Sequence, residues 1–318
     1  MPHPAPATGP ARLSARAPGS SRRWWTELPL VLFVYTAYSA CRLLARGDTS
    51  TAVDHGLAIL RFEQRLHLNA EHPLNRLFAE HPSLGIPADF LYASLHYGVT
   101  PAILIWLWRR RPSHYRIART SLLLATFIGL VGFVLVPTCP PRLLDPSYGF
   151  VDTMAQYASY GWWGGDASAP RGLGSLTNQY AAMPSLHVGW ALWSGLLLWR
   201  LGGTTWAKAA GIAYPAVIAV VVMGTANHYF LDAVAGTAVV GLGLLLARPA
   251  LRAADAVRER SRARTAPAVS GGCETSAGER IPRQPDHHGR PHAAAATAAA
   301  APPADPAPAG DGAAATAR

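Results

Sequence analysis

The sequence predicts an all-α integral membrane protein, a six-helix bundle with disordered N- and C-terminal tails. The first observation is composition. Of the 318 residues, 50% are hydrophobic and only 14% are charged, whereas a soluble domain usually carries about 25% charged residues. The second is distribution. The charges gather towards the ends, and the middle holds a series of apolar segments near the ~20 residues that a helix needs to cross a bilayer.

The two ends lack apolar periodicity and are predicted to be disordered. Residues 1–23 are rich in Pro, Ala, Ser and Arg and form a predicted cytoplasmic arm. A signal-peptide start is the weaker alternative, because no small-residue cleavage site follows it. Residues 250–318 begin with a basic stretch and continue as an Ala- and Pro-rich disordered tail. Residues 24–249 therefore form the predicted membrane domain.

Six apolar segments are predicted to span the membrane as helices. They are Leu28–Leu44, Ile86–Trp108, Ile117–Val136, Leu186–Leu201, Ala209–Met223 and Tyr229–Ala247. A seventh segment, Ala52–Leu68, mixes leucines with arginine and glutamate, and we expect it to lie as an amphipathic helix on the membrane surface. The fifth span contains Pro215, which a membrane helix tolerates when its neighbours satisfy the freed carbonyl.

Arginine gives the orientation, because cytoplasmic loops carry an excess of Lys and Arg. With six spans, all four basic groups fall on one side. They lie within residues 12–23, 109–116, 200–208 and 248–264. We therefore expect both termini in the cytoplasm, the protein in the plasma (cytoplasmic) membrane, and the segment Pro137–Pro184 on the outer face.

The candidate catalytic residues lie at this predicted outer face. His228 and Asp232 are four residues apart and share one face of a helix. The carboxylate can accept a hydrogen bond from one ring nitrogen of His228, which leaves the other nitrogen free to attack. His187 enters from another span and can supply the acid–base partner, since an unperturbed histidine exchanges its proton near neutral pH. A single interfacial histidine is more often a satisfied polar residue, but a carboxylate inside a membrane span favours function.

The candidate substrate-binding residues are Arg142, Ser185 and Asn227. The guanidinium fork of Arg142 suits phosphate oxygens, and it suits a structural lipid anchor equally well. Ser185 begins a helix whose free N–H groups form an anion site, although serine there is also a good N-cap. Asn227 directly precedes His228.

These stretches resemble a known family, the type 2 phosphatidic acid phosphatase superfamily. The resemblance rests on the Pro-Ser-Leu-His run at residues 184–187 and on His228 with Asp232 and Gly236 after it. The stretches at residues 137–142 and 227–232 are similar to its inositol phosphorylceramide synthase-like (inositolphosphotransferase) branch. The resemblance implies a six-helix membrane bundle and a phosphohistidine mechanism that needs no metal.

The resemblance also implies the roles of three residues. His228 is the nucleophile, Asp232 orients it, and His187 is the acid to the leaving group. The chain departs from the broad superfamily at two phosphate-binding positions. Val221 and Val222 stand where the superfamily has Ser and Arg, and no Lys-x6-Arg-Pro motif precedes the Pro-Ser-x-His run. With two cations missing, we expect Arg142 to take over part of their role and the substrate to be a diester headgroup, or the reaction to be transfer to an alcohol.

The predicted function is that of a membrane lipid phosphatase or headgroup phosphotransferase. Its expected substrate is a phospholipid, phosphoinositide-type or polyprenyl phosphate at the outer face, with water or an alcohol as acceptor. No cofactor, metal or nucleic-acid partner is expected. Two alternatives come from other classes: a transporter with His228 and Asp232 as a proton relay, and a non-catalytic lipid-binding scaffold. Asp89, His96 and Tyr97 of the second span either line an acceptor pocket or make helix–helix contacts.

Overall fold

The computed structural model describes residues 49–163 and 179–265, together with six single residues nearer the N-terminus. Within this part the chain forms eight α-helices, two short 3-10 helices and no strand, so the predicted helical class is confirmed there. The chain divides into two units, residues 1–266 and 267–318, and every described residue belongs to the first. The predicted tails beyond residue 265 and before residue 24, and most of the predicted span Leu28–Leu44, lie outside the described residues.

Four helices are long and apolar enough to cross a membrane. They are α4 (Pro82–Arg110), α5 (Pro112–Leu135), α8 (Thr205–Gly224) and α9 (Phe230–Thr265), the last through Arg262. A fifth apolar helix, α7 (Leu186–Leu201), has the bounds that the sequence predicts but only 16 residues, about 24 Å against an apolar bilayer core of about 30 Å. The total of six spans therefore stays a prediction.

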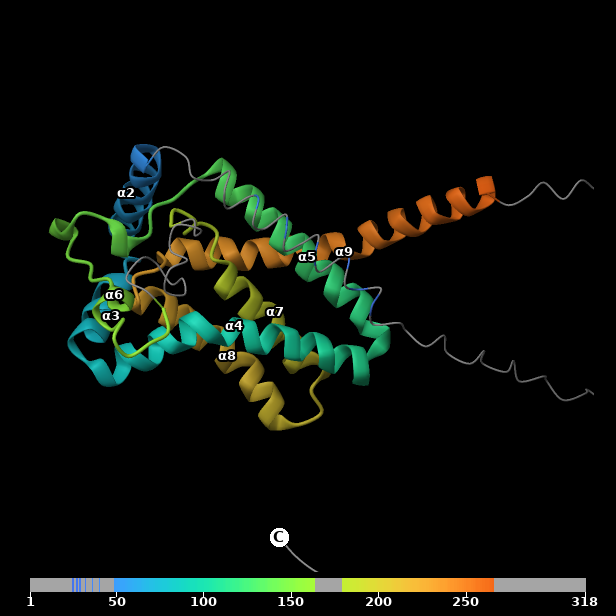
Figure 1. Ribbon diagram of the computed structural model, residues 1–318, viewed down its shortest axis with the longest axis horizontal. Helices are drawn as coiled ribbons and strands as arrows, with labels where there is room; N and C mark the ends of the chain where they lie inside the picture. Colours follow the sequence, from blue (N-terminus) through green and yellow to red (C-terminus); the bar gives the residue numbers. More distant parts are fainter. Residues whose placement is uncertain are drawn as a thin grey trace, which may run out of the picture. The chain divides into compact units, whose positions relative to one another are not determined.

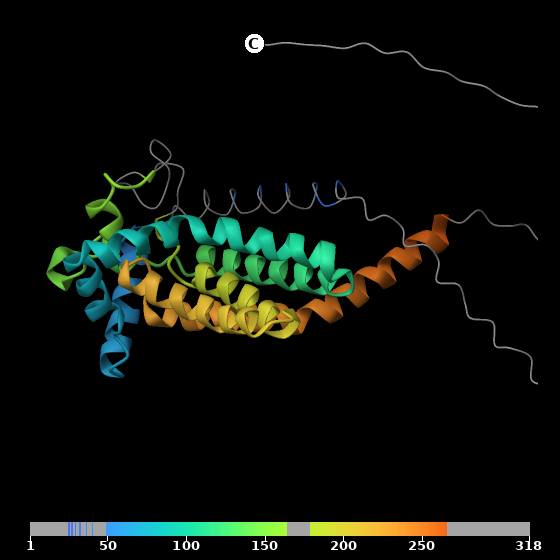
Figure 2. The same ribbon diagram turned by 90° about the horizontal axis from the view of Figure 1, so that it is seen from below.

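These five helices lie side by side, and the chain alternates direction between them (Figure 1, Figure 2). The closest pairs are α7 with α8 and α5 with α9, while α4 packs on both α7 and α8. Small residues permit the first pairing: a Cβ on Gly195 would lie 2.2 Å from the carbonyl oxygen of Gly211. Such close backbone approach is typical of helix pairs in membranes.

One end of this bundle carries the remaining helices, α2 (Thr49–Arg65), α3 (Glu71–Glu80) and the short α6 (Thr153–Gln156) (Figure 1, Figure 2). Residues 49–65 are helical as expected for the amphipathic segment, and its buried residues include Leu60 and Glu63. The first turns of α7 and α9 and the last turn of α8 lie at this same end, which therefore collects the sequence motifs.

The helix α9 is longer than its predicted span. It runs for 36 residues through Pro249 and the arginine-rich stretch that follows. Residues 250–265 are therefore helix and not the start of an irregular tail. Asp255 on this extension pairs with Arg116 of α5, an exposed contact that contributes little to stability.

Candidate active site

The start of α7 is fixed directly against α9. The hydroxyl oxygen of Ser185 accepts a hydrogen bond from the backbone N–H of Val188 and so caps the helix. The backbone N–H of Ser185 donates to the backbone carbonyl of Asp232 at 2.9 Å. Gly236 makes this approach possible, because a Cβ there would lie 2.1 Å from the carbonyl oxygen of Ser185. The two predicted catalytic helices therefore meet at their first turns.

His228 is held in one orientation by two acceptors. Its Nδ1 lies 2.8 Å from the carbonyl oxygen of Ala182 and 3.4 Å from Oδ2 of Asp232. Because both groups can only accept, Nδ1 is the protonated nitrogen and Nε2 carries the lone pair. Both residues are buried: His228 is 4% exposed and Asp232 is 0% exposed. The same Oδ2 accepts from the backbone N–H of Tyr229 at 2.9 Å, which fixes the carboxylate in turn.

His187 lies beside this couple, although it comes from a different helix. The centroids of the His187 and His228 rings are 5.9 Å apart and their planes are inclined by 58°. The ring of Tyr92, on α4, stacks on His187 with centroids 4.4 Å apart and lies 6.5 Å from His228. Two imidazoles from distant parts of the chain are thus neighbours, close enough for one phosphoryl group to contact both.

Arg142 is held against the turn that carries His228. Its Nε donates to Oδ1 of Asn227 at 2.9 Å, and its Nη1 pairs with Oδ2 of Asp152 at 2.9 Å. Its backbone N–H donates to the carbonyl of Ala226. Within residues 49–163 and 179–265, the two side-chain bonds use two of the five N–H groups of the guanidinium and leave Nη2 open to an anion.

Asn227, which accepts the hydrogen bond from Arg142, lies in the short turn between α8 and α9. Its Nδ2 donates to the hydroxyl of Thr225 at 2.9 Å, so both ends of the amide are engaged. Its neighbour Ala226 has a φ of 52°, a left-handed conformation that non-glycine residues rarely adopt. The geometry therefore makes Asn227 a support for Arg142.

One face of α4 points towards the histidines. Asp89, Tyr92 and His96 are spaced by three and four residues, which puts them on one side of a helix. Oδ1 of Asp89, a residue with 0% exposure, accepts from the hydroxyl of Thr153 at 2.8 Å. Tyr97, in contrast, is 71% exposed. The sequence analysis had singled out Asp89, His96 and Tyr97 but not Tyr92, which the same spacing would have found.

Two further carboxyl groups lie beneath the first turn of α9. Glu63 and Glu71 are both 0% exposed, and Oε1 of Glu63 accepts from the backbone N–H of Leu231 at 2.6 Å. Burial, with a contribution from the neighbouring Glu71, raises the pKa of Glu63 to about 9. Burial likewise raises the pKa of Glu71. The pair therefore retains at least one proton at neutral pH.

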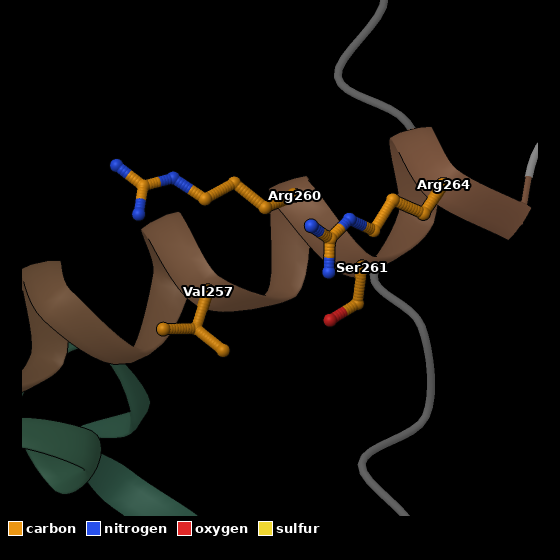
Figure 3. A pocket seen from close by; sticks show the side chains of 4 residues that line it. All are labelled: Val257, Arg260, Ser261 and Arg264. Atoms are coloured by element: carbon orange, nitrogen blue, oxygen red, sulfur yellow. The ribbon is translucent and has the colours of Figure 1, made fainter.

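Other types of site are less well supported in the described part of the chain. No three His, Cys, Asp or Glu side chains lie close enough together there to hold a metal ion. Burial raises the pKa of the Cys139 thiol to about 11, so this cysteine is not a thiolate nucleophile at neutral pH. A surface hollow on α9 is lined by Val257, Arg260, Ser261 and Arg264 (Figure 3). Its lining residues lie roughly 38–48 Å along the helix from Asp232 at ~1.5 Å per residue, and none of the candidate catalytic residues is among them.

The fold and the site define a class: helical membrane proteins with a paired-histidine site at one end of the bundle. The chain belongs to the PAP2 superfamily, whose sequence profile matches residues 57–246, more than half of its length. Members of this superfamily are phosphatases and phosphotransferases, which identifies the chain as a membrane enzyme that acts on phosphate-bearing substrates. Neither the curated proteins nor the solved structures contain a match to it.

Proposed function

We propose that the chain is a lipid phosphatase or headgroup phosphotransferase that works through a phosphohistidine on His228. The observation that carries the proposal is the arrangement of the two imidazoles. Nδ1 of His228 is committed to Ala182 and Asp232, so Nε2 is available as a nucleophile. The ring of His187 lies 5.9 Å away, and its proposed role is to donate a proton to the leaving oxygen.

In the first step Nε2 of His228 attacks phosphorus in line with the bond to the lipid oxygen. The N–P bond forms while the P–O bond breaks, and protonated His187 gives its proton to the departing oxygen. Such a proton transfer contributes roughly 10²–10⁴ in rate. Asp232 stabilises the positive charge that develops on the ring of His228, as an orienting carboxylate does in other histidine-based sites.

In the second step an acceptor hydroxyl attacks the phosphorus on the side opposite Nε2. Neutral His187 removes the hydroxyl proton, a new P–O bond forms, and the N–P bond breaks to return His228. Water as acceptor gives hydrolysis, and an alcohol gives transfer. His187 ends the cycle protonated, as it began.

The charge of the site favours a phosphodiester. Val221 and Val222 are buried in the apolar core that surrounds Phe78, so this part of α8 supplies no cation. Arg142 bonds to Asn227, the residue before His228, and Asp152 offsets part of its charge. A diester carries one negative charge and a monoester up to two, so a single partly neutralised arginine suits the diester better.

These properties are those expected of the inositol phosphorylceramide synthase-like branch, and we assign the chain to it as part of this proposal. A phospholipid, phosphoinositide-type or polyprenyl phosphate would enter from the outer leaflet. Arg142 and the N–H groups at the start of α7 would hold its phosphate. Both termini would then be cytoplasmic, with the active site on the outer face of the plasma membrane.

The test is a panel of radiolabelled lipid phosphates and phosphodiesters, with and without inositol-type and sugar alcohols as acceptors. The purified chain should convert at least one diester, and His228→Ala should lower that rate by at least 10³-fold without lowering the melting temperature. His114→Ala, at an exposed position of α5, is the matched control and should keep full activity. Ordinary activity of His228→Ala in detergent would refute the proposal, as would loss of activity with EDTA and its rescue by zinc.

A further inference from the structure

A third imidazole lies next to the proposed acid, and the mechanism above does not use it. His96, on α4, has its ring centroid 4.6 Å from that of His187, with the two planes at 82°. The sequence places His96 one helical turn after Tyr92. Polar rings inside a membrane bundle are costly and mark functional sites, so this contact calls for a role.

Besides His228, three other rings lie around the ring of His187. Tyr92 stacks on its face with centroids 4.4 Å apart and planes inclined by 24°. His96 meets it edge to face, and Trp190, one turn further along α7, lies 6.5 Å away. Trp190 is itself fixed, because its Nε1 donates to the hydroxyl of Thr126 on α5 at 3.1 Å.

These contacts restrict the two side-chain torsions of His187 in different ways. A stacked neighbour fixes the plane of the ring, and a perpendicular neighbour blocks its displacement within that plane. Within residues 49–163 and 179–265, His187 donates no hydrogen bond to a carboxylate that would perform this task, in contrast to His228, whose Nδ1 lies near Asp232. Orientation of the proposed acid therefore depends on ring contacts.

We propose that His96 is a positioning residue for His187, holding its proton donor towards the leaving oxygen of the phosphoester. The inference rests on the proposed function, because it concerns the acid of that mechanism. It matters energetically because a catalytic group displaced by about 1 Å can lose roughly 10²-fold in rate. His96 does not touch the reacting atoms and acts only through His187.

The leaving group of the substrate separates this role from a merely structural one. An alcohol leaving as alkoxide needs the proton of His187, whereas nitrophenolate leaves without one. Two phosphodiesters serve as probes: phosphatidylinositol, which releases diacylglycerol, and hexadecyl 4-nitrophenyl phosphate, which releases nitrophenolate. A general loss of folding or binding slows both probes alike. A misaligned acid slows the first step for phosphatidylinositol only, whereas the second step, in which His187 acts as base, is common to both probes and must be kept out of the measurement.

The experiment measures the rate of leaving-group release in the first turnover, with enzyme in excess over each probe and the full-length protein in detergent. His96→Ala should slow phosphatidylinositol turnover by about tenfold and the nitrophenyl ester by less than twofold, and His96→Phe, which keeps a ring, should recover most of the loss. The same His→Phe change at exposed His114 is the matched control and should alter neither rate. Melting temperatures identify any variant that fails to fold.

His187→Ala tells the two proposals apart. It should show the same leaving-group pattern with a larger amplitude, and adding His96→Ala to it should cause no further loss, because the two residues act as one unit. If His187→Ala slows both esters equally, the acid role in the proposed function fails. If His187→Ala shows the pattern and His96→Ala slows both esters equally, or neither, only the positioning role of His96 is overturned.

Discussion

Two arginine–aspartate pairs lie at opposite ends of the helix bundle and differ sharply in their surroundings. At the catalytic end, the side chains of Arg142 and Asp152 are 4% and 17% exposed. At the other end, those of Arg116 and Asp255 are 41% and 44% exposed. Exposed pairs contribute about 0–1 kcal/mol, whereas breaking a buried pair costs about 3–5 kcal/mol because it leaves an unpaired charge.

The difference extends beyond the two pairs. At the catalytic end most polar side chains are buried, and several bond to a second element of the fold, as Arg142 does to the turn at Asn227 and Glu63 does to the start of α9. At the other end the arginines lie on the surface of α9 and its neighbours. The same residue types are therefore buried and held in fixed positions at one end, and exposed and solvated at the other. Matched substitutions at the two ends test this contrast.

The largest effect is expected for Asp232→Asn. The amide can still accept from Tyr229, but its NH₂ can face His228 and favour the wrong tautomer, so kcat should fall by roughly 10³–10⁴-fold, as for the equivalent change in other histidine-based sites. Asp255→Asn at the opposite end should change kcat less than twofold. Steady-state kinetics on the best substrate of the panel checks both. Equal effects of the two substitutions would contradict the proposed role of Asp232.

The next largest effect is expected for Arg142→Lys. Lysine keeps the charge but lacks the planar fork, so it cannot bond Asn227 and Asp152 together and still present N–H groups to a phosphate. We expect kcat/KM to fall by about 10²-fold, with a lower melting temperature because Asp152 loses its partner. Arg116→Lys is the matched control, and its kinetic constants and melting temperature should stay within error of the wild type.

The sequence predicted the apolar helices well because a helix that crosses a bilayer needs a long apolar run, and such a run can be recognised in the sequence itself. The bounds of Leu186–Leu201 agree with α7 to the residue, and the four-residue spacing of His228 and Asp232 gave their contact. It did not predict that α9 continues past Ala247, because the apolar run ends there and the helix continues through Pro249 into a charged stretch.

The supports of the site were harder to predict than its reactive residues. Glu63 and Glu71 stand in charged, amphipathic segments where a carboxylate normally faces water. Only the packing of α2 and α3 beneath α9 makes them buried. Asp152 is likewise recognised as part of the site only because its carboxylate pairs with Arg142, ten residues earlier in the chain. No local pattern encodes such partners, so their roles appear only in three dimensions.

A smaller effect is expected where α7 and α9 touch. In Gly236→Ala the new methyl group would lie 2.1 Å from the carbonyl oxygen of Ser185, so the helices must separate, at a cost of about 1–3 kcal/mol. We expect a lower melting temperature and reduced kcat, because the first turns carry His187 and Asp232. Gly241→Ala on the same helix meets nothing within 4 Å and should stabilise slightly, by up to about 1 kcal/mol. Similar melting temperatures for the two variants would contradict the close contact.

The buried acid pair makes the stability of the protein depend on pH. Burial raises the pKa of Glu63 to about 9 and also raises that of Glu71, above the ordinary value near 4.3. Between those values the folded chain binds more protons than the unfolded chain, so stability falls as pH rises, by up to about 1.4 kcal/mol per pH unit for one proton. The melting temperature of the wild type should therefore decline from pH 5 to pH 9.

Glu71→Gln should flatten this decline, because an amide can donate to Glu63 without a titrating proton and leaves one acid in place of two. The groups that face the pair are Asp232 and Tyr229, at the start of α9 and just before it, while α8 carries its one charged side chain, Lys208, in its first turn at the far end. Glu80→Gln, on the same helix as Glu71 but exposed and paired with Arg76, should leave the pH dependence unchanged. A melting temperature that rises with pH in the wild type would show that the two carboxyl groups are ionised in the folded protein, and that the contrast between buried and exposed acids on α3 does not hold.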